Sequence, residues 1–197
     1  MAKAKDAESI LKMMKDEDIQ FVDFRFTDPR GKMQHVTFHD NIIDEDTFAD
    51  GVMFDGSSIA GWKAINESDM NLMPDVTTAH LDPFYGQSTL AIFCDVLEPE
   101  TGEGYSRDPR MTAKKAEAFV KQSKVGDTVY VGPEAEFFIF DDVRFAADPY
   151  NTGFKLDSVE LPSNSDTEYE MGNQGHRPAT KGGYFPVNPT DSAQDMR

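Results

Sequence analysis

The chain contains little cysteine and few basic residues, and each shortage excludes a class of function. Its single cysteine, Cys94, rules out an internal disulfide framework and a cysteine-based zinc site. The apolar residues before it, 90–93, predict a buried strand in which the thiol acts as a small hydrophobic group. Nineteen lysines and arginines stand against 36 acidic residues, which gives a net charge of −17. This charge argues against nucleic acid and anionic membranes as partners and is compatible with cations.

Long apolar runs are also missing. No stretch is long enough to cross a membrane, and the first residues, MAKAKD, lead into an amphipathic segment and not into an apolar signal sequence. We therefore expect a cytoplasmic protein. Core-forming residues are present in normal supply, because 39% of the chain is hydrophobic, with 15 Phe and 6 Tyr. A length of 197 residues suits one ordinary domain or two small ones.

The spacing of apolar residues predicts regular elements in the first half of the chain. Ala7, Ile10, Leu11 and Met14 recur at helical spacing after a capping Asp6. An alternating run follows, and its return after a strong turn predicts a β-hairpin. The expected elements are a helix at 6–17, strands at 21–27 and 32–38, a helical turn at 44–49 and a strand at 89–97.

The second half begins with the best candidate for a linker, the polar and glycine-rich stretch 99–104. Asp108 and Pro109 then predict the start of a helix that ends near Ser123. The apolar residues of this helix that we expect to face inward are Ala113, Ala116, Phe119 and Val120. The remainder of the chain, 144–197, shows little periodicity.

Glu134 and Glu136 begin an expected strand at 134–140, which follows another at 127–131. Alternate residues of a strand share a face, so the two carboxylates point the same way, beside faces that turn apolar within four residues. At about 6.6 Å apart they would repel by roughly 2–3 kcal/mol at an effective dielectric of 20. A shared divalent cation would relieve this cost, so the pair are candidate metal ligands. The alternative is that Glu134 precedes the strand and only Glu136 is constrained.

The loop at 54–62 places the only tryptophan near an acid and two hydroxyl groups. Asp55 could offer a carboxylate to a cation, and Ser57 and Ser58 could offer hydroxyls. Equally, Asp55 could close an Asx turn while Trp62 anchors the loop on a neighbouring core. A tryptophan in such a loop could also contact another subunit. Composition leaves these interpretations open.

A second glycine-rich segment, 181–187, has the wrong order of glycine and lysine for a nucleotide P-loop. Its glycines would let the backbone approach a ligand, where Tyr184 could present a hydroxyl, and the alternative is an ordinary turn. None of the four histidines fits a zinc-protease motif, and no serine or cysteine lies in a nucleophile elbow.

Taken in order, these segments resemble bacterial type I glutamine synthetase over essentially the whole chain. The matching stretches are 21–31, 53–62 (MFDGSSIAGW), 66–70 (NESDM), 132–138 (GPEAEFF) and 175–195. The resemblance implies an α+β fold. It implies a β-grasp-like N-terminal domain at 1–104 and, at 105–197, the truncated start of the β-rich catalytic domain.

The resemblance also implies a reaction. The family joins ammonia to L-glutamate in an ATP-dependent amidation that passes through a γ-glutamyl phosphate, in the service of nitrogen assimilation. Two divalent cations per active site, Mg²⁺ or Mn²⁺, neutralise charge between phosphate and carboxylate groups. Glu136 matches a ligand of the metal nearer glutamate, and Glu134 matches a ligand of the metal nearer the ATP phosphates.

Other residues match the ammonium site of the family. Asp55 and Ser58 match residues that help to bind ammonium, and Tyr184 matches a third contributor from the catalytic domain. The carboxylate of Asp55 would hold the cation and take its proton. In the family this loop enters the active site of a neighbouring subunit, with the residue matching Trp62 near the nucleotide. The implied assembly is a homo-oligomer, a double hexameric ring.

The chain departs from the family in length, since it stops at Arg197 and family members are more than twice as long. The other metal ligands, the arginines for phosphate and glutamate, and the adenylylated tyrosine match no part of it. Two glutamates cannot fix an ion that wants about six oxygens, so we expect the isolated chain to be inactive. The alternative is a short non-catalytic paralogue that acts as a binding or assembly module of the full-length enzyme. A stop codon after Arg197 would favour that module.

Overall fold

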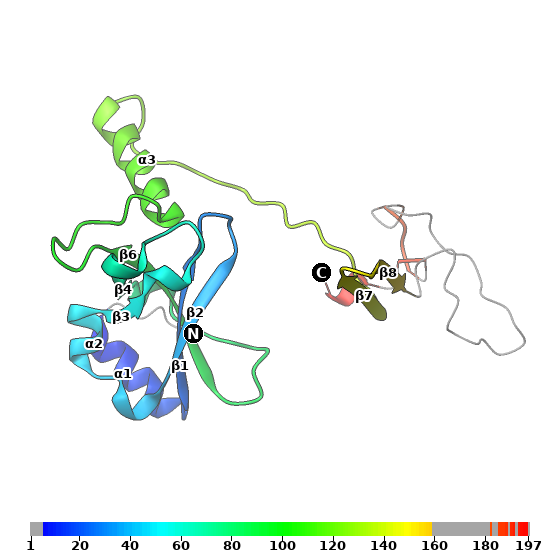
Figure 1. Cartoon of the computed structure of the whole chain (residues 1–197), viewed down its shortest axis with the longest axis horizontal. Coiled ribbons are helices and arrows are strands. Elements are labelled where there is room, and N and C mark those ends of the chain that lie inside the picture. The colour runs from blue at the N-terminus through cyan, green and yellow to red at the C-terminus, as the bar shows by residue number, and fades with distance from the viewer. Residues whose placement is uncertain (1–5, 159–181, 183–184, 189, 192, 197) are drawn as a thin grey trace, which may run out of the picture. The chain divides into compact units, whose positions relative to one another are not determined.

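The computed structural model describes residues 6–158, 182, 185–188, 190–191 and 193–196 (Figure 1). It divides into two units, Met1–Tyr130 and Val131–Arg197. The first unit contains helices α1 (Ala7–Asp16), α2 (Glu45–Asp50) and α3 (Pro109–Ser123), and strands β1 (Phe21–Thr27), β2 (Met33–His39), β3 (Val52–Asp55), β4 (Asp69–Pro74), β5 (His80–Leu81) and β6 (Thr89–Leu97). The second unit contains β7 (Asp142–Asp148) and β8 (Asn151–Asp157).

A mixed sheet forms the centre of the first unit. Its strands lie in the order β2-β1-β6-β4-β3, and β5 also pairs with β6. β6 runs parallel to β1 and antiparallel to β4 and β5. It changes neighbours along its length, because residues 89–93 pair with β1 and residues 94–97 pair with β4. Both halves of the sheet therefore depend on β6.

The first helix and the hairpin form where the sequence predicts them. Asp6 caps α1 by accepting a hydrogen bond from the backbone N–H of Ser9 at 2.9 Å. Ile10 and Met14 are buried one turn apart and belong to the core cluster. β1 and β2 pair antiparallel along their whole length. The predicted helical turn near 44–49 and strand at 89–97 are likewise confirmed, as α2 and β6.

The core of the first unit takes alternate side chains from its strands. Val22, Phe24 and Phe26 of β1 are all buried, and each such side chain stabilises the fold by about 1.5–3 kcal/mol. Cys94 of β6 is also buried as a free thiol. Burial raises the pKa of this thiol well above its ordinary value, so it stays protonated. The prediction that Cys94 is a small buried hydrophobic group is confirmed.

The other face of β1 carries a buried carboxylate. Asp23 accepts hydrogen bonds from Thr37 Oγ1 at 2.6 Å and Arg25 Nε at 2.7 Å, and His35 Nδ1 lies 2.6 Å from it. Arg25 also pairs with Asp82 at 2.5 Å. Burial opposes ionisation of Asp23, but these hydrogen bonds outweigh it and hold the pKa of Asp23 below its ordinary value. Asp23 is thus the centre of a charged network.

α3 has the predicted bounds, but its apolar side chains are not buried. Asp108 caps it by accepting from the Arg110 N–H at 3.0 Å, and Pro109 takes the first helical position. None of the residues of α3, all of which are described, is buried, and Phe119 is 67% exposed. Helical spacing predicts which side chains share an apolar face, but it does not provide a neighbouring surface that would bury them. The predicted inward orientation is therefore wrong for Ala113, Ala116 and Phe119, which are exposed, and Val120 is half-buried.

Charge holds the start of α3 to the sheet instead. Arg110 pairs with Asp95 of β6 at 2.8 Å and with Asp75 just after β4. Lys114, one turn further along α3, pairs with the same Asp95. These contacts fasten the first two turns of the helix to the sheet.

Among the described residues, no helix has the length and apolarity that a membrane crossing requires.

The strands predicted at 127–131 and 134–140 are not formed, since 127–140 lies in no helix or strand. A strand needs a neighbour that shares its backbone hydrogen bonds, and an alternating sequence does not supply one. The rings of Phe138 and Phe140, which the strand prediction placed on one face, stack with centroids 5.9 Å apart.

The second unit contains a hairpin that the sequence analysis did not predict. β7 and β8 pair antiparallel around a turn at residues 149–150. Phe145 and Phe154 lie opposite each other in this pair and are 79% and 78% exposed. Apolar and polar residues do alternate over the short stretches 143–145 and 154–156, so the sequence carried a weak signal for this hairpin that the interpretation of 144–197 as lacking periodicity missed.

We predict that Asp23→Asn lowers the free energy of unfolding by about 2–3 kcal/mol, because buried donors lose their charged acceptor. The folded pKa of Asp23 is lowered, so its contribution is fully present above about pH 4 and is lost as the pH falls through the folded pKa. Urea denaturation followed by circular dichroism, from neutral pH to about pH 2.5, measures both effects. Asp127→Asn, at an exposed position, is the control. Equal losses in the two variants would contradict the prediction.

Candidate functional site

The Asp55 carboxylate lies exposed at the end of β3, where a short 3-10 turn begins at Gly56. Its Oδ1 accepts hydrogen bonds from the Ser57 N–H at 2.8 Å and the Ser57 hydroxyl at 2.6 Å, and its Oδ2 accepts from the Ser58 hydroxyl at 3.3 Å. The bonds from Ser57 hold the pKa of Asp55 below its ordinary value. The carboxylate is therefore ionised at neutral pH. Its neighbours fix its direction without cancelling its charge.

Gly56 allows this turn to form against the sheet. Its N–H donates to the Ser68 carbonyl at 2.7 Å, which closes the loop between β3 and β4. A Cβ atom at Gly56 would lie 2.5 Å from the side chain of Met70, a fully buried core residue, and 3.0 Å from the Ser68 carbonyl. Any larger residue would push the loop off the core and displace Asp55 with it.

Trp62 lies at the other end of the loop and is only 6% exposed. Its ring contacts those of Phe26, Phe54 and Tyr105, with centroids 5.4, 6.0 and 5.4 Å away. The interpretation of an Asx turn with the tryptophan anchored on a neighbouring core is confirmed for this chain. Within its own chain, Trp62 is therefore a buried core residue. Whether the loop reaches the nucleotide of another subunit stays a prediction.

Glu134 and Glu136, the predicted metal ligands, belong to the second unit. Both side chains are exposed, in the segment that forms no strand. Carboxylate oxygens are the ligands that Mg²⁺ and Mn²⁺ prefer, so the residue types fit. In the described parts of the chain, no group of three or more His, Cys, Asp or Glu side chains could hold a metal ion. The two glutamates are therefore the right residue type for a metal site, but two ligands are too few to form one.

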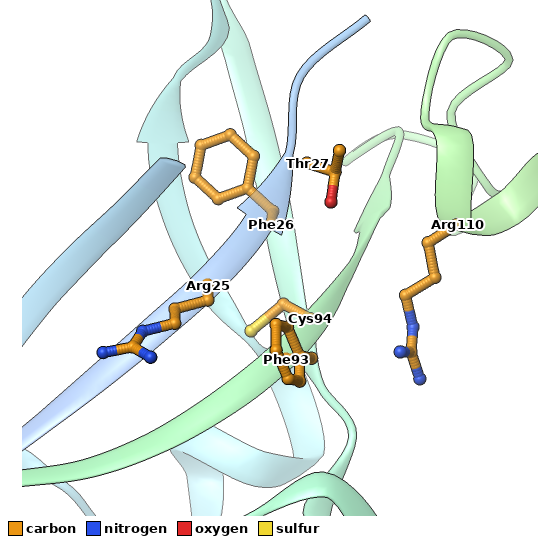
Figure 2. Close-up of a pocket in the computed structure, with 6 residues that line it drawn as sticks. All are labelled: Arg25, Phe26, Thr27, Phe93, Cys94 and Arg110. Carbon is orange, nitrogen blue, oxygen red and sulfur yellow. The ribbon is translucent and has the colours of Figure 1, made fainter. Parts of the chain in front are cut away.

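A hollow of about 270 Å³ lies where β1 and β6 part, lined by Arg25, Phe26, Thr27, Phe93, Cys94 and Arg110 (Figure 2). Arg25 and Phe93 form the last register pair of the two strands, and Arg110 reaches the hollow from the start of α3. Each arginine is already paired with two carboxylates. The hollow therefore offers little free positive charge to an anion, and its thiol is protonated.

The described residues bring only part of the predicted site together. Asp55 and Ser58 meet in one turn, and Trp62 closes the same loop from inside the core. Glu134 and Glu136 lie in the other unit. Tyr184, the third predicted contributor to the ammonium site, lies outside the described residues.

Sequence reasoning missed Arg107, which contacts the loop from the segment after β6. Its Nη1 donates hydrogen bonds to the backbone carbonyls of Gly61 and Trp62, the second at 3.1 Å. The partners are about 45 residues apart in sequence. An arginine in a polar stretch gives no local signal for such a contact.

Comparison with known proteins identifies two adjoining family domains. The glutamine synthetase beta-Grasp domain matches residues 18–99, and the glutamine synthetase catalytic domain matches residues 106–197. Glutamine synthetase of Rhizobium meliloti (strain 1021) is 71% identical over 191 residues, which are 97% of this chain and 41% of that protein. Glutamine synthetase of Vibrio cholerae is 56% identical over 190 residues, 96% of this chain and 40% of that protein.

A solved structure agrees with these matches. The cryo-electron microscopy structure of Plasmodium falciparum glutamine synthetase has a TM-score of 0.80 and 29% identity, over 99% of this chain and 39% of that one. The expected α+β class, a β-grasp domain followed by part of a catalytic domain, is confirmed. The boundary expected between residues 104 and 105 stays a prediction. The chain spans about 41% of the length of the curated relatives it matches.

We predict that the 197-residue chain binds Mn²⁺ weakly, with a Kd no tighter than the order of 1 mM, because two carboxylates leave most of the coordination sphere to water. Isothermal titration of the chain and of its Glu134→Gln/Glu136→Gln variant measures this. Glu100→Gln/Glu103→Gln, at two exposed positions, controls for the general effect of negative charge. Micromolar binding that only the 134/136 variant loses would contradict the prediction.

Proposed function

Because the chain belongs to the glutamine synthetase family, we propose that it is the first part of a glutamate–ammonia ligase, which amidates L-glutamate with ammonia at the expense of ATP. The observation that carries this proposal is the loop of Asp55, an exposed and ionised carboxylate held by two serines. A fixed negative charge that faces solvent is what a binding site for ammonium requires. The chain spans about 41% of its relatives, so the activity belongs to a longer protein.

The loop would supply the nucleophile in two steps. Asp55 and Ser58 bind ammonium, the first through charge and the second through its hydroxyl oxygen, and Tyr184 adds a third polar contact. Asp55 then takes one proton from the cation, which leaves neutral ammonia with a free lone pair. Ammonia attacks the carbonyl carbon of the γ-glutamyl phosphate, the bond from that carbon to the phosphate oxygen breaks, and the nitrogen loses one further proton, which the departing phosphate can carry away, to give the neutral amide. The serine bonds support the binding of the cation, because they direct the carboxylate and keep it ionised without neutralising it.

Glu134 and Glu136 would each contribute to a divalent-cation site in the longer protein. Their carboxylates fit Mg²⁺ or Mn²⁺ in chemistry, and further ligands must come from elsewhere. When bound, such ions neutralise the negative charges of the ATP phosphates and the substrate carboxylate. Glu136 would bind the ion nearer glutamate, and Glu134 the ion nearer ATP.

The assembly that we propose is a homo-oligomer, the double hexameric ring of the family, in the cytoplasm. The turn that carries Asp55 and Ser58 would enter the active site of the neighbouring subunit. The exposure of both side chains supports this, since neither is covered in its own chain. Trp62 supports the turn from inside the core. In the assembly it would lie close to the nucleotide region of that neighbour.

We predict that the 197-residue chain forms no glutamine from ATP, L-glutamate, ammonium and Mg²⁺, since it supplies only part of the metal coordination. A chromatographic assay for glutamine on purified protein tests this, with the complete Rhizobium meliloti relative as the positive control. Glutamine formed above background by the chain alone would contradict it.

In a complete enzyme, Asp55→Asn should lower kcat/KM for ammonium by about 100-fold or more and change KM for ATP little, because a base and a countercharge are lost together. The complete enzyme can be made by joining this chain to the remaining part of the Rhizobium meliloti relative, which we call the chimaeric enzyme. Asp69→Asn is the matched control, because exposed Asp69 lies opposite Asp55 in the β3–β4 pair. Unchanged dependence on ammonium would refute the role of Asp55.

A further inference from the structure

The segment between β6 and α3 folds into a rigid turn that lies against the Asp55 loop. After β6 ends at Leu97, the Glu98 N–H donates to the Glu103 carbonyl at 2.8 Å, and the Gly102 N–H donates to the Glu98 carbonyl at 2.8 Å. Leu97 and Gly104 form a β-bridge. The chain thus doubles back tightly beside β6, and the residues after the turn have fixed positions.

Arg107 lies between two buried residues of this returning segment. Tyr105 is 4% exposed, and its N–H donates to the Val96 carbonyl at 2.8 Å. Asp108 is fully buried and accepts a hydrogen bond from the Val96 N–H at 3.1 Å. The chain on both sides of Arg107 is therefore tied to β6, by the backbone of Tyr105 and by the side chain of Asp108. The side chain of Arg107 thus extends from a part of the backbone whose position is fixed.

Four contacts made by Arg107 and Lys63 join this segment to the end of the loop. Arg107 Nη1 donates to the carbonyls of Gly61 and Trp62. Lys63 Nζ donates to the Glu98 carboxylate at 2.7 Å. The same ammonium lies 5.4 Å from the ring centroid of Tyr105, in a cation–π contact. Residues 61–63 are thus held from both ends of the turn.

The loop between Gly56 and Gly61 depends on these end contacts. At its start, the bond between the Gly56 N–H and the Ser68 carbonyl ties it to the sheet. At its end, Gly61 adopts a positive φ of 86°, which few other residues accept, and so redirects the chain toward the core. Arg107 donates to the carbonyls of the two consecutive peptide bonds that precede and follow Trp62. It therefore fixes the orientation of the loop where the chain changes direction.

We infer that Arg107 is a positioning residue for the ammonium-binding loop, holding Asp55 and Ser58 in place through the Gly61–Trp62 carbonyls. This inference rests on the proposed function. The contact between Arg107 and the loop also connects the two family domains. The loop lies within the β-grasp match, and Arg107 lies within the catalytic-domain match. A change in the path of the segment that joins the domains would reach the ammonium site through this guanidinium, together with the contacts of Lys63 and Tyr105.

The single tryptophan makes the first test direct, because all tryptophan fluorescence of the 197-residue chain comes from Trp62. Arg107→Gln should shift its emission to longer wavelength and increase quenching by acrylamide under native conditions. Arg107→Lys should recover part of the change, since an ammonium can reach one carbonyl. Arg30→Gln, at an exposed arginine in the turn before β2, should leave both readings unchanged. Native emission and quenching in Arg107→Gln equal to those of the parent chain would overturn the inference.

The second test separates positioning from general stability and from the proposed function. In the chimaeric enzyme, Arg107→Gln should raise KM for ammonium by on the order of five- to tenfold relative to KM for ATP, with partial rescue by Arg107→Lys. A parallel loss for both substrates, together with a lower urea midpoint, would show a merely structural role and overturn the inference. If Asp55→Asn leaves ammonium use unchanged, the proposed function fails, and the fluorescence result still decides whether Arg107 holds the loop.

Discussion

The first unit depends on the carboxylate of Asp108, which accepts a backbone hydrogen bond from β6 along the edge where β1 no longer pairs with it. β6 leaves β1 after Phe93, and beyond that point the backbone of Val96 is satisfied by Asp108 and by the N–H of Tyr105. An unpaired buried N–H would cost about 1–3 kcal/mol. Burial raises the pKa of Asp108, although its hydrogen bonds from Val96 and Arg110 partly offset this. The same side chain caps α3, so the sheet, the returning segment and the helix meet at one residue.

The excess of acidic residues is used inside the fold as well as on its surface. Arg25 bridges two carboxylates on one side of the hollow, and Arg110 bridges two on the other. Lys114 shares Asp95 with Arg110, so few cations serve several anions. This arrangement attaches α3 to the sheet although none of its apolar residues is buried. A net charge of −17 therefore indicates more than solubility in this chain.

Sequence patterns predicted the elements whose causes are local. The cap of α1 at Asp6, the β1–β2 hairpin and the start of α3 at Asp108 each follow from neighbouring residues, and all were confirmed. Features that need a distant partner were not predictable. Phe119 has the spacing of a core residue but no cover within its unit, and 134–140 has the alternation of a strand but no neighbour. For the site, the sequence located Asp55 and Ser58, whereas Arg107 acts across about 45 residues and left no pattern.

The comparison of two aspartates explains why the loop is suited to a cation. Asp23 is buried, and a guanidinium, a hydroxyl and an imidazole share its charge, so it serves the fold. Asp55 has a lowered pKa from hydroxyl and backbone donors, which stabilise the ionised form and add no positive charge. The first carboxylate is neutralised by its partners and inaccessible. The second keeps a full negative charge at an exposed and fixed position, so it can attract a cation. The contacts at both ends of the loop hold that charge in place.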